Sequence, residues 1–86
     1  MPFEYDLAKS NANKIKHGIG FKEAERMWRG RILELNARYH GESRKLCIGK
    51  IENIYWTAII TYRGSKIRII SIRRARENEK EIKLSE

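Results

Sequence analysis

The chain has little cysteine and little proline, and it lacks any long apolar run. Its 86 residues include one cysteine, Cys47, and one proline. A single thiol cannot form an internal disulfide or, alone, a thiolate metal site, which is typical of a reducing compartment. No apolar run reaches the length of about 18 residues that a membrane span needs, and no secretory signal opens the chain. We therefore expect a cytoplasmic protein that does not enter a membrane.

Signatures of metal and nucleotide sites are also missing from the sequence. There is no glycine-rich phosphate loop with its lysine, no HExxH sequence and no CxxC pair. Each of these patterns brings ligands for a cofactor or a metal ion to one place. The sequence therefore predicts a protein that uses neither.

Positive charge is abundant. Nineteen Lys and Arg residues against eleven Asp and Glu residues give a formal net charge of +8. A small basic domain attracts phosphate-rich polymers, so nucleic acid or an acidic protein that imitates it becomes the expected partner. The hydrophobic content of 41% suffices for a folded core, and the length allows one domain, residues 1–86, with a shallow surface site.

Helical periodicity dominates the first third of the chain. Asp6 can cap a helix, and apolar residues recur at helical spacing until Gly18, which predicts a helix over residues 7–17. A second short helix follows Gly20 and ends at Gly30. Residues 3–5 alternate in polarity and predict an edge strand before the first helix.

The remainder is rich in β-branched and aromatic residues. We expect strands at 31–36, 45–51, 54–62 and 66–72, a loop at 37–43, and a short final helix or frayed tail within 74–84. Short connections at 52–53 and 63–65 favour antiparallel hairpins. The sequence thus predicts an α+β fold: a twisted antiparallel sheet, two N-terminal helices on one face and a short C-terminal helix.

Several sequence motifs resemble those of the BrnT family of type II toxins. The first half carries FEYD at residues 3–6, NKIKHGI at 13–19 and FKEA at 21–24. The second half carries RKLCIG at 44–49, Thr61 with Arg63, and IRIISIRRA at 67–75. The resemblance spans about residues 3 to 81, and so nearly the whole chain.

This resemblance implies a RelE-like fold and a bacterial ribonuclease toxin that inhibits translation and growth. It further implies metal-independent endoribonuclease activity and neutralisation by a BrnA-like antitoxin in a hetero-oligomer, with DNA contacted only through the antitoxin. Two positions depart from the family pattern. Many members carry an acidic residue where this chain has Tyr62, and many carry a tyrosine near Lys83.

Candidate catalytic residues follow from the chemistry of RNA cleavage. Without a metal ion, the reaction needs a base for the 2′-hydroxyl, fixed cations for the charge on phosphorus, and a proton donor for the leaving 5′ oxygen. Arginine suits the second task because its planar fork matches a phosphate. The expected cations are Arg44, Arg63, Arg68 and Arg73, and the candidates for base or acid are Lys16, His17, Tyr62 and Glu79.

One spacing limits this assignment. Arg68 and Arg73 are an odd number of residues apart, so on a regular strand they would point to opposite faces of the sheet. Either the strand ends or bulges near Ser71, or only some of these arginines are catalytic. Each of these residues also has a non-catalytic interpretation. The arginines would then be solvated charges at the sheet edge or contacts to the antitoxin. His17 would interact favourably with a helix C-terminus, and His40 would be an ordinary loop residue.

Two other functions compete with the toxin hypothesis. One is a non-catalytic basic module that binds nucleic acid or an antitoxin through the same surface. The other is an inactivated relative, kept for complex formation and repression, which the departures at Tyr62 and Lys83 suggest.

Overall fold

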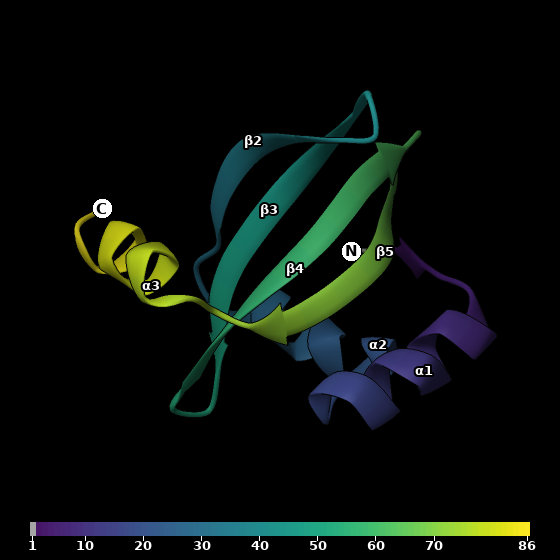
Figure 1. Ribbon diagram of the computed structural model, residues 1–86, viewed down its shortest axis with the longest axis horizontal. Helices are drawn as coiled ribbons and strands as arrows, with labels where there is room; N and C mark the ends of the chain where they lie inside the picture. The colour runs from purple at the N-terminus through teal and green to yellow at the C-terminus, as the bar shows by residue number, and fades with distance from the viewer. Residues whose placement is uncertain (1) are drawn as a thin grey trace.

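The fold is built on a five-stranded sheet with the strand order β1-β5-β4-β3-β2 (Figure 1). The computed structural model describes residues 2–86. An antiparallel meander contains β2 (Leu33–Tyr39), β3 (Glu42–Ile51), β4 (Ile54–Arg63) and β5 (Lys66–Arg74). The short edge strand β1 (Phe3–Glu4) runs parallel to β5. The α+β class is confirmed, and the sheet is mixed because the helices carry the chain away from β1 before the meander returns to it.

Two-residue turns join the strands of the meander. The predicted connections near Glu52-Asn53 and Gly64-Ser65 are confirmed. The predicted loop at 37–43 is wrong, because β2 and β3 continue to a tight turn at His40-Gly41. Both turn residues have positive φ, 51° and 79°, as the preferred two-residue hairpin turn requires. This segment looked like a loop because its strand residues are polar and exposed.

The helices begin and end close to the predicted residues. Helix α1 spans Leu7–His17, where the Asp6 side chain accepts a hydrogen bond from the Lys9 N–H at 3.0 Å and Gly18 ends the helix in the left-handed region. The second helical segment is a single turn, α2 (Phe21–Ala24), followed by a 3₁₀ helix, η1 (Glu25–Arg29), which ends at Gly30. The terminal helix α3 spans Glu77–Leu84.

The hydrophobic core lies between the sheet and the segment from the end of α1 to η1. Phe21, Ala24 and Met27 pack against strand residues such as Ala58 and Ile60, all of them buried. We call this side the helix-covered face, and α1 and α2 lie behind the sheet in Figure 1. Cys47 belongs to this core, and burial raises the pKa of its thiol to about 12.

Helix α3 packs on the opposite side of the sheet, which we call the open face. Thr57 lies between two core residues of β4, so its side chain points away from the core. Its hydroxyl donates a hydrogen bond to Glu79 of α3 at 2.9 Å. Helix α3 therefore covers one end of the open face and leaves the rest to solvent.

Polar side chains fasten α1 to the sheet. The buried residues of this helix are Ser10 and Asn13. Ser10 Oγ accepts a hydrogen bond from the Phe21 N–H at 2.8 Å. Asn13 Nδ2 donates to the Ile19 and Ile72 carbonyls at 2.8 Å each, and its Oδ1 accepts from the Ile72 N–H at 3.2 Å. The inner side of α1 is thus held by directed hydrogen bonds.

Candidate active site

A β-bulge in β5 decides which arginines share a face. Ile59 pairs with Ser71 whereas the next residue, Ile60, pairs with Ile69, so Ile70 is one extra residue on β5. Arg68 lies opposite Thr61, and Arg73 lies opposite Thr57. The two threonines are an even number apart on β4, so both arginines point to the open face. Of the alternatives that the sequence left open, a strand end or a bulge near Ser71 or a division of roles among the arginines, the structure shows the bulge.

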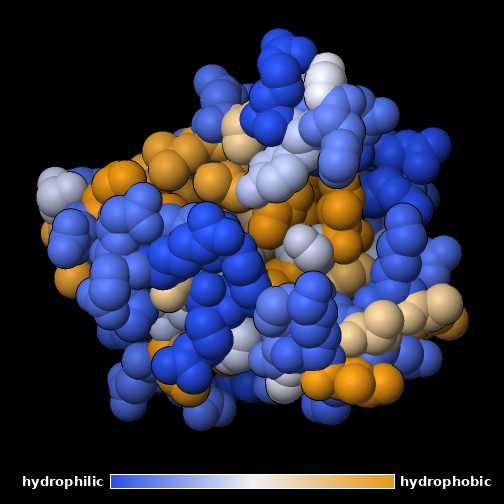
Figure 2. All heavy atoms as spheres, viewed as in Figure 1, coloured by the Kyte–Doolittle hydropathy of each residue, from blue (hydrophilic) through white to orange (hydrophobic). Residues whose placement is uncertain are grey.

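A groove of about 370 Å³ opens on this face beside α3. The groove is surrounded by the end of α1, the end of β2, the β2–β3 turn, β3, β4, β5 and the residue before α3. Figure 2 shows apolar residues in the middle of the open face and hydrophilic residues around them. The groove is lined by His17, Tyr39, His40, Arg44, Ile59, Ile70, Ser71, Arg73 and Arg76.

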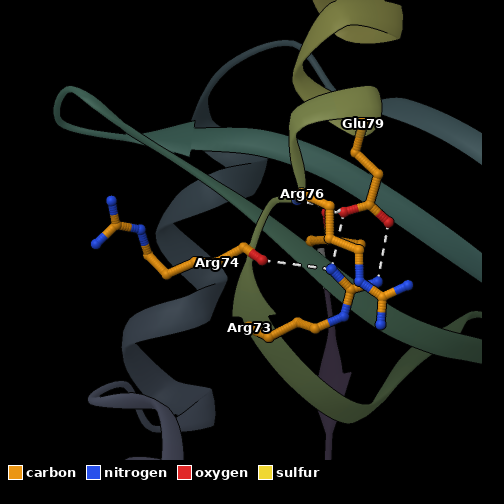
Figure 3. Close-up of polar contacts among 5 residues, drawn as sticks. Arg73, Arg74, Arg76 and Glu79 are labelled. Carbon is orange, nitrogen blue, oxygen red and sulfur yellow. Dashed lines mark hydrogen bonds and ion pairs between the residues drawn. The ribbon is translucent and has the colours of Figure 1, made fainter.

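Arg73 is fixed in this groove by Glu79 (Figure 3). Its Nη1 and Nη2 donate to the two carboxylate oxygens at 2.8 and 2.9 Å, and Nη1 also lies 3.3 Å from the Arg74 carbonyl. Glu79 itself is 5% exposed and accepts two further hydrogen bonds, from the Thr57 hydroxyl and the Arg76 N–H. The guanidinium of Arg73 therefore has one preferred position.

The contacts between Arg73 and Glu79 shift the pKa values of both residues. The Arg73 hydrogen bonds, with those from Arg76 and Thr57, outweigh the effect of burial and lower the pKa of Glu79 to about 2. The same pair, with Tyr39 nearby, raises the pKa of Arg73 above its ordinary value. Glu79 is consequently a carboxylate at neutral pH, and both its oxygens hold other groups.

The side chains of Arg74 and Arg76 point in different directions. The Arg76 side chain lies beside the guanidinium of Arg73, whereas Arg74 points the other way (Figure 3). The Arg74 guanidinium lies 5.7 Å from the ring centre of Trp56, a residue of the core on the helix-covered face. Arg76 was missed by sequence reasoning, although its place three residues before Glu79 at a predicted helix start was a usable signal.

Two more of the predicted residues reach the groove from other elements. Arg44 comes from β3 and forms an ion pair with Glu42. His17 is the last residue of α1, and the left-handed Gly18 turns the chain back directly after it. His40, expected to be an ordinary loop residue, lies in the β2–β3 turn and also lines the groove with Tyr39.

Four of the predicted catalytic residues lie outside the groove. Arg68 and Arg63 are at the β1 edge of the open face, where they contact Glu4 at 2.9 and 3.5 Å. Tyr62 is on the helix-covered side, and its hydroxyl donates to Glu34 at 2.6 Å, which raises its pKa to about 12. Lys16 is exposed on α1 and does not line the groove.

A comparison with protein-family models found a match over residues 5–79, described as ribonuclease toxin, BrnT, of type II toxin-antitoxin system. The chain belongs to the BrnT family. The matched segment includes all the residues that line the groove, from His17 to Arg76, together with Glu79. Membership in the BrnT family implies an RNA substrate and an antitoxin partner. A comparison with curated proteins found no match.

Between residues 2 and 86, no helix has the length and apolar character that crossing a bilayer demands. In the same part of the chain, no three His, Cys, Asp or Glu residues lie close enough together to hold a metal ion.

Proposed function

We propose that this chain is an endoribonuclease toxin that cuts RNA in the open-face groove without a metal ion. One observation carries the proposal: Arg44, Arg73 and Arg76 line the same groove as His17. Cleaving RNA in this way inhibits translation and growth, and a BrnA-like antitoxin neutralises the toxin in a cytoplasmic hetero-oligomer. The family match supports the ribonuclease class, and the groove supports the mechanism.

The proposed reaction is an internal transfer of the phosphoryl group. A base takes the proton of the ribose 2′-hydroxyl as its oxygen attacks the adjacent phosphorus. The bond from phosphorus to the 5′ oxygen breaks, and an acid gives a proton to that oxygen. The products are a 2′,3′-cyclic phosphate and a free 5′-hydroxyl. Negative charge grows on the non-bridging oxygens, and positioned guanidinium groups stabilise it in the transition state.

Arg73 is the best-positioned of these cations. Glu79 takes two of its N–H groups and the Arg74 carbonyl takes a third, which leaves the others for a phosphate oxygen. Because Glu79 holds the fork in place before RNA arrives, little reorganisation is needed during the reaction. Arg44 and Arg76 add positive charge on either side of the groove.

His17 is the preferred group for proton transfer. An imidazole can both accept and donate a proton near neutral pH, and His40 supplies a second one in the same groove. Glu79 suits this task poorly because its pKa is about 2, and Tyr62 because its hydroxyl is bound to Glu34 on the other face. We therefore assign Glu79 to positioning Arg73.

The departures from the family pattern do not affect these groups. Tyr62 lies on the helix-covered side, and Lys83 pairs with Glu86 at 2.6 Å near the end of α3. Neither residue lines the groove. This placement favours an active enzyme over an inactivated relative.

Incubation of single-stranded RNA with the purified protein in EDTA tests the proposal. We expect cleavage that leaves cyclic phosphate and 5′-hydroxyl ends. Activity that vanishes in EDTA and returns with a divalent cation would contradict the metal-independent mechanism. RNA binding without cleavage under either condition would favour the non-catalytic basic module instead.

A second experiment tests the partner. Expression of the chain alone should arrest growth and translation, and co-expression of the adjacent gene product should restore both. Purification of the co-expressed pair as one complex would support the hetero-oligomer. Continued growth arrest despite a soluble adjacent gene product would argue against that product as the antitoxin.

A further inference from the structure

Helix α1 has its apolar side turned away from the protein. Leu7 is 73% exposed and Ile15 is 88% exposed, while the side that contacts the sheet carries Ser10 and Asn13. At about 100° per residue, the exposed side forms one continuous arc opposite the buried residues. We call this arc the α1 stripe, and it consists of Leu7, Ala8, Asn11, Ala12 and Ile15.

Positive charge borders the α1 stripe on both sides. Lys14 lies along one border, and Lys9 and Lys16 lie along the other. Helix α1 contains no acidic residue between Leu7 and His17. Lys14 stands alone on its border and its Nζ lies 3.7 Å from Glu23, whereas the other border has two lysines. An apolar strip between lysines matches a partner helix that is apolar on one side and acidic at its margins.

We propose that the α1 stripe is a docking site for an acidic amphipathic helix of the antitoxin. The proposal rests on the pairing with an antitoxin described above, and it names the surface and the chemistry of the contact. Leu7 and Ile15 would anchor the partner helix, and the alanines between them would let the two helices approach closely. The lysines would pair with acidic residues at its margins.

Other occupants fit the α1 stripe less well. In a second copy of this chain, packed helix against helix, lysines would face lysines across the interface. RNA offers phosphates to lysines but has little to bury against Leu7 and Ile15. A lipid surface usually binds helices with a broader apolar side that carries aromatic residues, and this stripe has two large apolar side chains.

The α1 stripe and the groove share no residue. The five residues of the stripe lie on the outer side of α1, while His17, the last residue of the same helix, lines the groove on the open face. An antitoxin helix bound there would not touch Arg44, Arg73 or Arg76. Antitoxin affinity should therefore be separable from cleavage by substitutions in α1.

Calorimetric titration of the purified toxin with its cognate antitoxin tests the proposal. Leu7→Glu and Ile15→Glu each replace an apolar contact by a charge that repels an acidic partner. We expect each to weaken binding at least about 10-fold, and the pair about 100-fold or more. Cleavage of RNA by the same variants without antitoxin should stay within about twofold of wild type.

Leu84→Glu is the matched control, because Leu84 is 68% exposed on a different helix. It should leave the affinity within about twofold. Lys9→Gln with Lys14→Gln should weaken binding and flatten its dependence on salt. Because cleavage and antitoxin binding are measured separately, a wild-type chain that binds antitoxin but does not cleave RNA would contradict the proposed function and leave this inference standing.

Three results would overturn the inference. One is unchanged antitoxin affinity in the Leu7→Glu/Ile15→Glu variant, or an equal loss in Leu84→Glu. Another is a wild-type dimer in light scattering that the double variant converts to monomers, which would assign the α1 stripe to a second copy. The third is binding to vesicles of phosphatidylserine and phosphatidylcholine that the double variant abolishes while antitoxin affinity stays the same.

Discussion

Arg73 and Arg68 lie on the same strand and the same face, and each has a glutamate partner, yet their environments differ. Arg73 binds Glu79 through two hydrogen bonds, and Glu79 is buried and bound to Thr57 and Arg76 as well. Arg68 contacts Glu4 through one nitrogen at 2.9 Å, at the edge of the sheet. The first arginine is held in one position, and the second is a half-exposed edge charge.

The difference shows that a shared sequence motif does not give its members equal roles. Both arginines belong to the segment IRIISIRRA at residues 67–75. Transition-state stabilisation depends on donors that are already in position, while attraction of RNA depends mainly on charge. We therefore expect Arg73 to act in catalysis and Arg68 in binding.

The largest expected effect is on the rate of RNA cleavage by Arg73→Lys. Lysine keeps the charge but loses the planar fork, so the rate should fall about 100- to 1000-fold while RNA binding persists. Single-turnover cleavage assays, with circular dichroism to confirm the fold, measure this. Arg68→Lys is the matched control and should cleave within about threefold of wild type. Equal rates for the two variants would remove the distinction between the two arginines.

The second-largest expected effect is on the free energy of unfolding. Glu79→Gln leaves the half-buried charge of Arg73 without its partner and should lower the free energy of unfolding by about 3 to 4 kcal/mol at neutral pH. Glu4→Gln breaks the more exposed pair at the edge of the sheet and should lower the free energy of unfolding by about 1 kcal/mol or less. Urea denaturation of both variants compares the two clusters directly. Similar losses would mean that burial does not separate them.

Low pH should remove the stabilisation that the Arg73–Glu79 pair gives to the wild-type protein. The folded-state pKa of Glu79 is about 2 against an ordinary value of 4.5, so its contribution is fully present above pH 4.5 and is lost as the pH falls toward 2. The shift corresponds to about 3 kcal/mol. Unfolding measured across this range should show a steeper acid loss for wild type than for Glu79→Gln. Parallel curves would contradict the assigned pKa.

The smallest effect concerns RNA binding by Arg68→Gln. Removal of one edge charge should weaken binding about two- to threefold and reduce the slope of log affinity against log salt by about one. Filter binding of a non-cleaved oligonucleotide at several salt concentrations checks this. A salt slope identical to that of wild type would show that Arg68 does not approach the RNA backbone.

Local signals predicted most of the fold. The ends of the first helix were predicted from Asp6 and Gly18, since a capping carboxylate and a left-handed glycine act within a few residues. The turn at His40-Gly41 was missed because the polar residues on both sides of it resembled a loop. The apolar residues of α1 predicted a helix, but which side would face the sheet depended on Ser10 and Asn13 finding partners far along the chain.

The site was predicted in part. Arg44, Arg73 and His17 lie in the groove, and the odd spacing of Arg68 and Arg73 raised a bulge near Ser71 as one of several alternatives. The role of Glu79 could not be read from the sequence, because it depends on α3 packing over Thr57. A contact between residues that are distant in sequence leaves no periodic signal.

Asn13 also has a consequence for how chains can associate through the sheet. Its carboxamide pairs with both the N–H and the carbonyl of Ile72, as the backbone of a further strand would. Strand β1 covers the start of β5, and the Asn13 amide occupies the backbone groups of Ile72 farther along the same edge. Together they prevent another chain from adding a strand along β5. At the opposite border the sheet ends in β2, whose exposed residues include charged and aromatic side chains. A partner that extends this sheet by strand addition would therefore do so beside β2.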